Sequence, residues 1–279
     1  MGMEIEQAVD YLNATIYGVV QGLAEFLPIS SSGHLALLPK YLGIIDPGVA
    51  FDLAMHVGTA LAVVIYFHRE VGSLLVSTFQ LLHPGRKRDA NSFFALNLII
   101  ATITTIVIAL AVKDLAASWG RGVEIIAINL MIFAVLMSLA DLFAPVRAIT
   151  GKLTMERQLM WKNALLIGLF QGMAVFPGVS RSGATLTISR WLGLTRSEAT
   201  RFSFVLSLPI ILGGFITKLP ELSGEQAGLS FYPLLWGVVI SLVVGILTII
   251  FFLKFIERVG LLPFALYRIF LAAAILGGL

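Results

Sequence analysis

Residues 18–33 read GVVQGLAEFLPISSSG, and residues 168–183 read GLFQGMAVFPGVSRSG. The two stretches align without a gap at a constant offset of 150, and eight of their sixteen positions are identical. Similarity at a fixed spacing is typical of duplicated architectures. We interpret it as an internal duplication, with one repeat over about 11–143 and the other over about 161–278.

The composition of the 279-residue chain is that of an integral membrane protein. Hydrophobic residues make up 58% and charged residues only 13%, whereas about a quarter of a soluble domain is charged. Residues 1–10 contain three acidic residues and no Lys or Arg, so we expect no cleavable signal peptide. The chain has no cysteine, which excludes disulfides, thiolate metal sites and a cysteine nucleophile. The basic residues are scattered over short segments, so we expect no binding of nucleic acid.

Six stretches are long and apolar enough to cross a hydrocarbon core of roughly 30 Å. They are 51–67, 93–112, 123–143, 202–217, 231–255 and 263–278. Four shorter stretches come as two pairs, each broken by Gly, Pro and Ser: about 11–27 with 34–45, and 161–176 with 184–194. Each pair is typical of a re-entrant hairpin that reaches the midplane and turns back. The predicted fold is therefore an all-α polytopic membrane protein, a single membrane domain over 1–279 with six transmembrane helices and two re-entrant helix hairpins.

The orientation of the chain in the membrane is predicted from the number of crossings in each repeat and from the distribution of Lys and Arg. A re-entrant pair followed by three crossings ends on the opposite side, so the second repeat must be inverted relative to the first. If residues 68–92 lie inside, thirteen Lys and Arg residues lie on inner segments: Arg69, Arg86, Lys87, Arg88, Arg147, Lys152, Arg157, Lys162, Arg190, Arg196, Arg201, Lys254 and Arg258. Outer segments hold four: Lys40, Lys113, Arg121 and Lys218. The positive-inside rule then predicts a plasma (inner) membrane protein with both termini and the site facing outside.

Two serine-rich stretches precede the second helix of each hairpin. We expect these helices to begin near His34 and near Ala184. Serine caps helix N-termini, and the free N–H groups and macrodipole there attract anions. Inversion would bring the two N-termini together, with Arg181 offering a fork of donors suited to phosphate. The predicted substrate-binding residues are Arg181, Ser30, Ser32, Ser180, Ser182, Gly183 and Thr185, although the simpler interpretation of the serines other than Ser31 is capping alone.

The first hairpin also carries groups that can do chemistry. Glu25 could bind a divalent cation or act as a base, Ser31 could be a nucleophile, and His34 lies one helical turn later on the same face. An ionisable residue at membrane depth is costly, so we expect a function for these residues, the alternative being a structural Glu–Arg or Glu–His pair. The duplication replaces Glu25, Ser31 and His34 by Val, Arg and Ala, so one hairpin is expected to carry the chemistry and the other the phosphate grip. For Asp52 and His56, near the start of a span, we expect interfacial solvation.

At these residues the chain resembles the undecaprenyl-diphosphate phosphatase family, the membrane enzymes linked to bacitracin resistance. The resemblance rests on QGLAEFLPISSSGH (21–34) and PGVSRSGAT (177–185), with a further match at FSF (202–204) leading to Pro209. It implies hydrolysis of undecaprenyl diphosphate to the monophosphate carrier lipid and inorganic phosphate, in the recycling of the carrier for cell-wall polymer synthesis. The partners expected are the polyprenyl diphosphate and the bilayer, with a homodimer as a further option.

The resemblance also implies roles for individual residues. Ser31, His34 and Glu25 fall on the catalytic positions, and Arg181 falls on the phosphate-binding arginine. A divalent cation, Mg²⁺ or Ca²⁺, is implied at Glu25 and position 21. Gln21 stands where many members have glutamate, so it could coordinate only as a neutral ligand. Whether Ser31 or His34 is the covalent nucleophile stays open.

Two other functions compete with this one. Inverted repeats with broken helices are also a transporter architecture, so a secondary transporter or lipid flippase for an anionic substrate is the main alternative. The cluster of Glu25, Ser31 and His34 in only one repeat favours an enzyme. A purely structural or partner-binding membrane protein is disfavoured by the same ionisable cluster.

Overall fold

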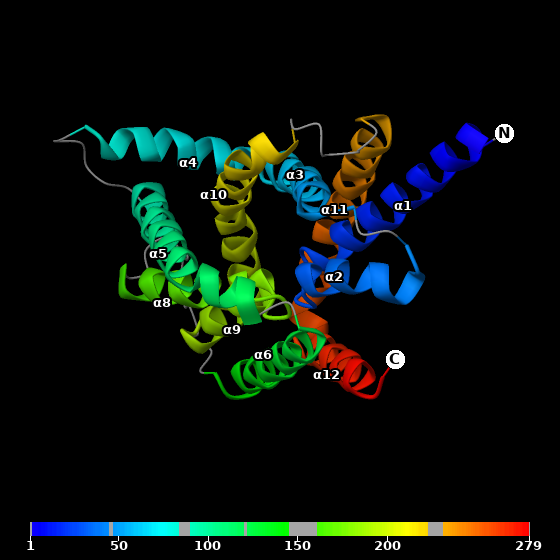
Figure 1. The fold of residues 1–279 in the computed structure, drawn as a ribbon. Helices are drawn as coiled ribbons and strands as arrows, with labels where there is room; N and C mark the ends of the chain where they lie inside the picture. Colours follow the sequence, from blue (N-terminus) through cyan, green and yellow to red (C-terminus); the bar gives the residue numbers. More distant parts are fainter. Residues whose placement is uncertain are drawn as a thin grey trace.

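The computed structural model describes residues 2–44, 47–83, 90–119, 122–144, 161–222 and 231–278, and within these ranges the regular structure is entirely helical (Figure 1). The first half contains α1 (Gly2–Ala24), α2 (Ser31–Leu42), α3 (Val49–Tyr66), α4 (His68–Leu81), α5 (Ala90–Trp119) and α6 (Val123–Phe143). The second contains α8 (Trp161–Gly172), a 3₁₀ turn (Met173–Val175), α9 (Arg181–Trp191), α10 (Arg196–Leu222), α11 (Phe231–Val259) and α12 (Leu262–Leu276). Several residues that carry the topology signal lie outside the described residues: Arg86, Lys87, Arg88, Arg121, Arg147, Lys152 and Arg157.

The described helices confirm a multi-pass helical membrane protein. Four are long and apolar enough to span a membrane: Asn91–Ser118, Val123–Phe143, Arg196–Thr217 and Phe231–Val259. A fifth candidate is the pair α3 and α4, which meet at an angle of 88°, and α12 is a shorter apolar helix. All six predicted spans coincide with helices, although several of these helices are longer than the spans.

The region after α3 differs from the prediction. The sequence analysis treated residues 68–92 as a charged connection, whereas residues His68–Leu81 form α4. This segment is too polar to be recognised as a span, but it is amphipathic. Leu74 is buried and α4 packs against α5, while Leu75 and Phe79 remain exposed. An apolar stripe at helical spacing stabilises a helix that lies against its neighbours without crossing a membrane alone.

The two predicted hairpins are observed as helix–turn–helix units, α1–α2 and α8–α9. Their second helices begin at Ser31 and Arg181, three residues earlier than expected. Ser30 and Ser180 are the N-caps, and their hydroxyls accept hydrogen bonds from the backbone N–H groups of the glycines three residues on, at 3.3 and 3.0 Å. Both serines have positive φ, 78° and 70°, which is uncommon for a residue with a Cβ. The earlier start places Ser31 and Arg181 in the first turn of their helices.

Each hairpin packs against a long helix of the other half of the chain. Helix α1 packs along α11, and α8 packs along α5. Glycine permits the close approach in both places: a Cβ at Gly18 would lie 2.6 Å from the carbonyl oxygen of Gly237, and one at Gly168 would lie 2.4 Å from that of Ala101. Small residues at such crossings let helix backbones approach closely in membrane proteins. In addition, α3 packs against α10 and α6 against α12.

Two basic residues assigned to inner segments are in fact bound to one buried carboxylate. Asp141, near the end of α6, accepts hydrogen bonds from Arg190 Nε at 3.3 Å and from Arg196 Nε at 2.7 Å. The backbone N–H of Leu261 donates to the same carboxylate at 2.8 Å. This cluster joins α6, α9, α10 and the start of α12. These two arginines therefore have a structural partner, in addition to any contribution they make to topology.

Arg268 of α12 joins the turns of both hairpins. Its side chain is fully buried. Nη1 donates to the carbonyl of Pro28 at 3.2 Å, and Nη2 donates to those of Gly178 at 2.8 Å and Val179 at 3.0 Å. Pro28 and Gly178 are equivalent at the offset of 150. One guanidinium thus satisfies corresponding carbonyls in the two non-helical turns, which sequence reasoning did not anticipate.

Replacing Arg268 with Met should destabilise the folded protein by about 3 kcal/mol or more, because several buried carbonyl groups would lose a charged donor. The measurement is unfolding of the purified protein in mixed micelles with increasing SDS. Arg258→Met, at an exposed arginine near the end of α11, is the matched control and should unfold like the wild type. Equal stability of the two variants would show that Arg268 does not hold the turns.

Candidate active site

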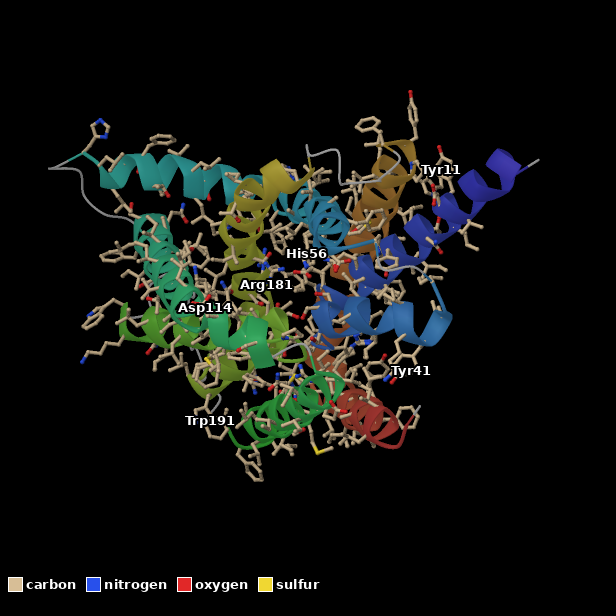
Figure 2. The ribbon with its side chains drawn as sticks, viewed as in Figure 1. Tyr11, Tyr41, His56, Asp114, Arg181 and Trp191 are labelled. Carbon is tan, nitrogen blue, oxygen red and sulfur yellow. The ribbon has the colours of Figure 1, made fainter. Side chains whose placement is uncertain are left out.

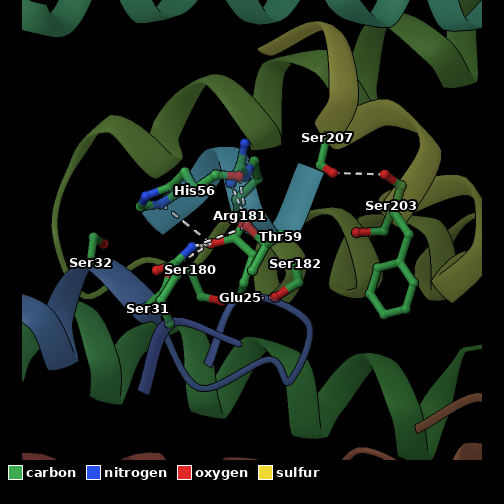
Figure 3. Close-up of polar contacts among 12 residues, drawn as sticks. Glu25, Ser31, Ser32, His56, Thr59, Ser180, Arg181, Ser182, Ser203 and Ser207 are labelled. Atoms are coloured by element: carbon green, nitrogen blue, oxygen red, sulfur yellow. Dashed lines mark hydrogen bonds and ion pairs between the residues drawn. The ribbon is translucent and has the colours of Figure 1, made fainter. Parts of the chain in front are cut away.

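Glu25 lies at the turn of the first hairpin, directly after α1, and only 5% of its surface is exposed. Its Oε2 accepts hydrogen bonds from Ser31 Oγ at 2.8 Å and from Gln21 Nε2 at 3.0 Å (Figure 3). Its Oε1 accepts from Arg181 Nη2 of the second hairpin. The carboxylate therefore connects the end of α1, the first turn of α2 and the first turn of α9.

A cavity of about 220 Å³ lies beside this cluster. Its polar lining consists of Ser31, Ser32, His56, Thr105, Gln171 and Arg181, and the other lining residues are mainly aliphatic. The first turns of α2 and α9 thus both contribute to it, as the inverted hairpins predicted. Helix N-termini, hydroxyls and a guanidinium are groups that bind phosphate oxygens.

Ser31 and Glu25 are placed to act together. A hydroxyl that already donates to a carboxylate can pass its proton to that carboxylate as its oxygen attacks an electrophile. Arg181 lines the same cavity with 17% of its side chain exposed. The arrangement can therefore offer a nucleophile, a base and a phosphate-binding cation at one place.

His34 is not brought to Ser31. Its Nδ1 donates to the carbonyl of Ser30 at 2.7 Å, and its Nε2 lies 2.7 Å from the hydroxyl of Tyr267 on α12. The two rings stack with their centroids 5.7 Å apart. Both ring nitrogens are thus occupied, and the described contacts of His34 include neither Ser31 nor Glu25. His34 is therefore hydrogen-bonded to Ser30 and Tyr267 and not to Ser31, because its ring turns toward α12. Its expected catalytic role stays a prediction from the sequence.

His56 is a site residue that the sequence analysis did not include. We expected it to be solvated at an interface, yet its side chain lines the cavity. Figure 2 labels it near Arg181, which lines the same cavity. Its Nε2 lies 3.4 Å from Glu25 Oε2, and its Nδ1 donates to the carbonyl of Asp52 at 2.7 Å. The signal was present in the sequence: a histidine inside an otherwise apolar span is functional by default.

The remaining predicted substrate-binding residues mostly hold the two turns. Ser30 and Ser180 are buried caps, as the simpler interpretation had it. Ser182 Oγ donates to the carbonyl of Leu27 in the other hairpin at 3.2 Å. Of the serines that neighbour Ser31 and Arg181, Ser32 is the one that lines the cavity.

Two further predicted binding residues lie behind the second hairpin. Thr185 Oγ1 is fully engaged inside the protein, with the carbonyl of Arg181 at 2.9 Å and with Ser203 Oγ at 2.5 Å. Gly183 faces Arg268, whose Nη1 would lie 2.7 Å from a Cβ at that position. Their contacts support the backbone that carries Arg181.

Gln21 and Glu25 offer oxygen ligands suited to a divalent cation. Gln21 is fully buried, and its Nε2 donates to Glu25 and, at 3.4 Å, to Thr59 Oγ1, but its Oε1 has no hydrogen-bond partner. A buried carbonyl oxygen without a partner costs free energy unless a ligand satisfies it. In the part of the chain that the structure describes, no group of three or more His, Asp or Glu side chains could hold a metal ion by itself. These residues therefore fit a cation that takes its other ligands from substrate phosphate and water.

Comparison with known proteins shows the family of this chain. The family described as "Bacitracin resistance protein BacA" matches residues 14–274. An "Undecaprenyl-diphosphatase" from Marinobacter nauticus (strain ATCC 700491 / DSM 11845 / VT8) is 41% identical over 271 residues, which cover 96% of this chain and 98% of that protein. The match includes both hairpins and all the residues of the cavity. The chain belongs to the bacitracin resistance protein BacA family.

Proposed function

We propose that this protein hydrolyses undecaprenyl diphosphate to the monophosphate carrier lipid and inorganic phosphate. The observation that carries the proposal is the hydrogen bond between Ser31 and Glu25 in a cavity that Arg181 enters from the opposite hairpin. Family membership and the name of the 41% identical relative support the same reaction. The product would return to cell-wall polymer synthesis as a carrier.

In the first step, Ser31 Oγ attacks the terminal phosphorus while its proton passes to Glu25. The phosphoanhydride bond breaks, the lipid monophosphate leaves, and a phosphoserine remains. Arg181 exchanges part of its contact with Glu25 for the equatorial phosphoryl oxygens and stabilises their charge. Glu25 then gives that proton to the departing lipid monophosphate. In the second step, a water molecule attacks the phosphorus and gives a proton to Glu25, the bond between phosphorus and Ser31 Oγ breaks, and Glu25 passes the proton to Oγ, which releases phosphate and restores Ser31.

A divalent cation, Mg²⁺ or Ca²⁺ by family resemblance, would be held by Glu25 and by the amide oxygen of Gln21. When bound, it would supply positive charge beside the phosphoryl oxygens. Gln21 now faces Glu25 with its Nε2, at 3.0 Å from Oε2, so this role requires the amide to turn over and present Oε1. With or without the cation, the residues of the chain orient the nucleophile and the phosphate.

We further propose six transmembrane helices, two re-entrant hairpins and an inverted repeat, in the plasma membrane with both termini and the site outside. The reciprocal packing supports this topology, because α1 packs on α11 whereas its equivalent α8 packs on α5. The matched caps at Ser30 and Ser180 support it as well. A homodimer remains a prediction from the sequence.

A transporter or flippase would need groups that bind the anion but would need no nucleophile. The second hairpin, which carries Val175 and Arg181 where the first has Glu25 and Ser31, has only the grip. Only the first hairpin has a carboxylate hydrogen-bonded to a serine at these positions. This asymmetry favours an enzyme over a transporter.

Purified protein should release inorganic phosphate from a polyprenyl diphosphate, and Arg181→Lys should lower kcat/KM at least 100-fold, because an ammonium lacks the planar fork of donors. Arg201→Lys is the matched control, since Arg201 forms an exposed pair with Glu70, and it should keep wild-type turnover. Absence of phosphate release by well-folded wild type would refute the proposed reaction, and a fully active Arg181→Lys would make Arg181 structural.

Turnover of substrate labelled in the terminal phosphate, quenched within one cycle, should leave the label on Ser31. Ser31→Ala should lose the label, whereas His34→Gln should keep it, because His34 contacts Ser30 and Tyr267 and not Ser31. Ser118→Ala, at an exposed serine of α5, controls for general effects. An acid-labile label on His34 in the Ser31→Ala protein would assign the nucleophile to the histidine.

A reporter of membrane sidedness tests the topology. Fusions after residue 279 or ahead of residue 10 should lie outside the cell, and an insertion in 83–90 should lie in the cytoplasm, as the charge distribution requires. Cytoplasmic signals from both termini would contradict the inverted arrangement.

A further inference from the structure

His56 has a geometry that the proposed reaction does not yet use. It reaches the cavity from α3, and its Nε2 faces Glu25 Oε2 at 3.4 Å. We propose that His56 Nε2 is a protein ligand of the divalent cation at this site, in place of the second carboxylate that Gln21 lacks. The inference rests on the proposed function and adds a nitrogen ligand to its cation site, for which Mn²⁺ is a suitable spectroscopic probe because it accepts both oxygen and imidazole ligands.

The tautomer of His56 is set by its other nitrogen. Nδ1 lies 2.7 Å from the carbonyl oxygen of Asp52, and because a carbonyl only accepts, Nδ1 carries the proton. In the neutral ring Nε2 then carries no proton and has a free lone pair. Nε2 is also the ring nitrogen that faces Glu25. Metal-binding histidines are oriented in this way, by a hydrogen bond from the nitrogen that does not coordinate.

The separation suits a bridging cation. The lone pair of a neutral imidazole and a carboxylate oxygen are both acceptors, so no hydrogen bond joins them. A cation about 2.1 Å from each atom would span the observed 3.4 Å with an angle of roughly 108° at the metal, as in tetrahedral sites. Glu25 Oε2 and His56 Nε2, 3.4 Å apart, could thus coordinate the same cation.

Gln21 can add a neutral ligand to the same site if its amide turns over. Its Oε1 is buried without a partner, while its Nε2 occupies a position 3.0 Å from Glu25 Oε2. The two ends of an amide have nearly the same shape. Rotation of the amide by half a turn would present the oxygen beside Glu25, where it can join the imidazole and the carboxylate as a neutral ligand. Substrate phosphate and water would complete the coordination.

The charges are consistent with this assignment. Glu25 is already paired with Arg181, and a neutral imidazole adds a strong ligand without adding a buried charge. The competing interpretation is an imidazolium that forms an ion pair with Glu25 and binds no metal. The two interpretations differ in whether a bound metal is coupled to a histidine nitrogen.

The test is a Mn²⁺ titration of the purified full chain in detergent with inorganic phosphate present, followed by pulsed EPR. Phosphate is included because Glu25 is already paired with Arg181 and the site needs further oxygen ligands. The wild type should bind one Mn²⁺ with a nitrogen coupling typical of imidazole, and protein labelled with ¹⁵N-histidine should show the ¹⁵N coupling instead. His56→Gln should abolish the coupling and raise the Kd at least tenfold. His68→Gln should change neither, since His68 is bonded through Nδ1 to the carbonyl of Ile65 at 3.0 Å and does not line the cavity.

Several results would overturn the assignment. They are bound Mn²⁺ without a nitrogen coupling in the wild type, no Mn²⁺ binding at all, or a coupling that persists in His56→Gln and disappears in His34→Gln. Gln21→Glu combined with His56→Gln should regain affinity without regaining the coupling, which separates loss of a ligand from loss of the fold. Phosphate release is measured separately, so an active enzyme without a Mn²⁺–nitrogen coupling would refute the His56 ligand and leave the proposed reaction intact.

Discussion

The ion pair between Glu25 and Arg181 is the interaction on which the rest of the site depends. It is the contact in which a charge of the first hairpin meets a charge of the second. The Glu25 side chain is buried and that of Arg181 is mostly buried, so removal of one partner leaves the other uncompensated. Because the two residues come from opposite hairpins, the pair also fixes where Ser31 lies relative to the phosphate-binding arginine.

The broken backbone between the helices is possible because protein groups satisfy its polar atoms. Ser30 and Ser180 cap the second helix of each hairpin, and Arg268 binds carbonyls of both turns from behind. Non-helical backbone inside a membrane requires partners of this kind. The consequence is that the first turns of two helices line one cavity, while Arg268 binds the carbonyls of both turns.

The two halves share a frame and differ in chemistry. Equivalent positions carry Ser31 in one hairpin and Arg181 in the other, and Glu25 has an apolar counterpart, Val175. The caps and the close glycine contacts are alike in both. A duplicated scaffold can therefore supply a nucleophile with its base from one side and an anion grip from the other.

The sequence by itself determined the helical membrane class, the broken helices and the capping serines, because apolar length, repeat spacing and helix-start chemistry are local signals. It offered a Glu–Arg pair only as the alternative to a catalytic role, and Glu25 and Arg181 are 156 positions apart. It predicted neither α4, whose amphipathic face needs α5, nor the contacts of His34, His56 and Arg268. His34 binds Tyr267, 233 residues away, and Arg268 binds a carbonyl 240 residues away. Such partners are chosen only when distant helices pack, so the tertiary structure alone decided which histidine enters the cavity.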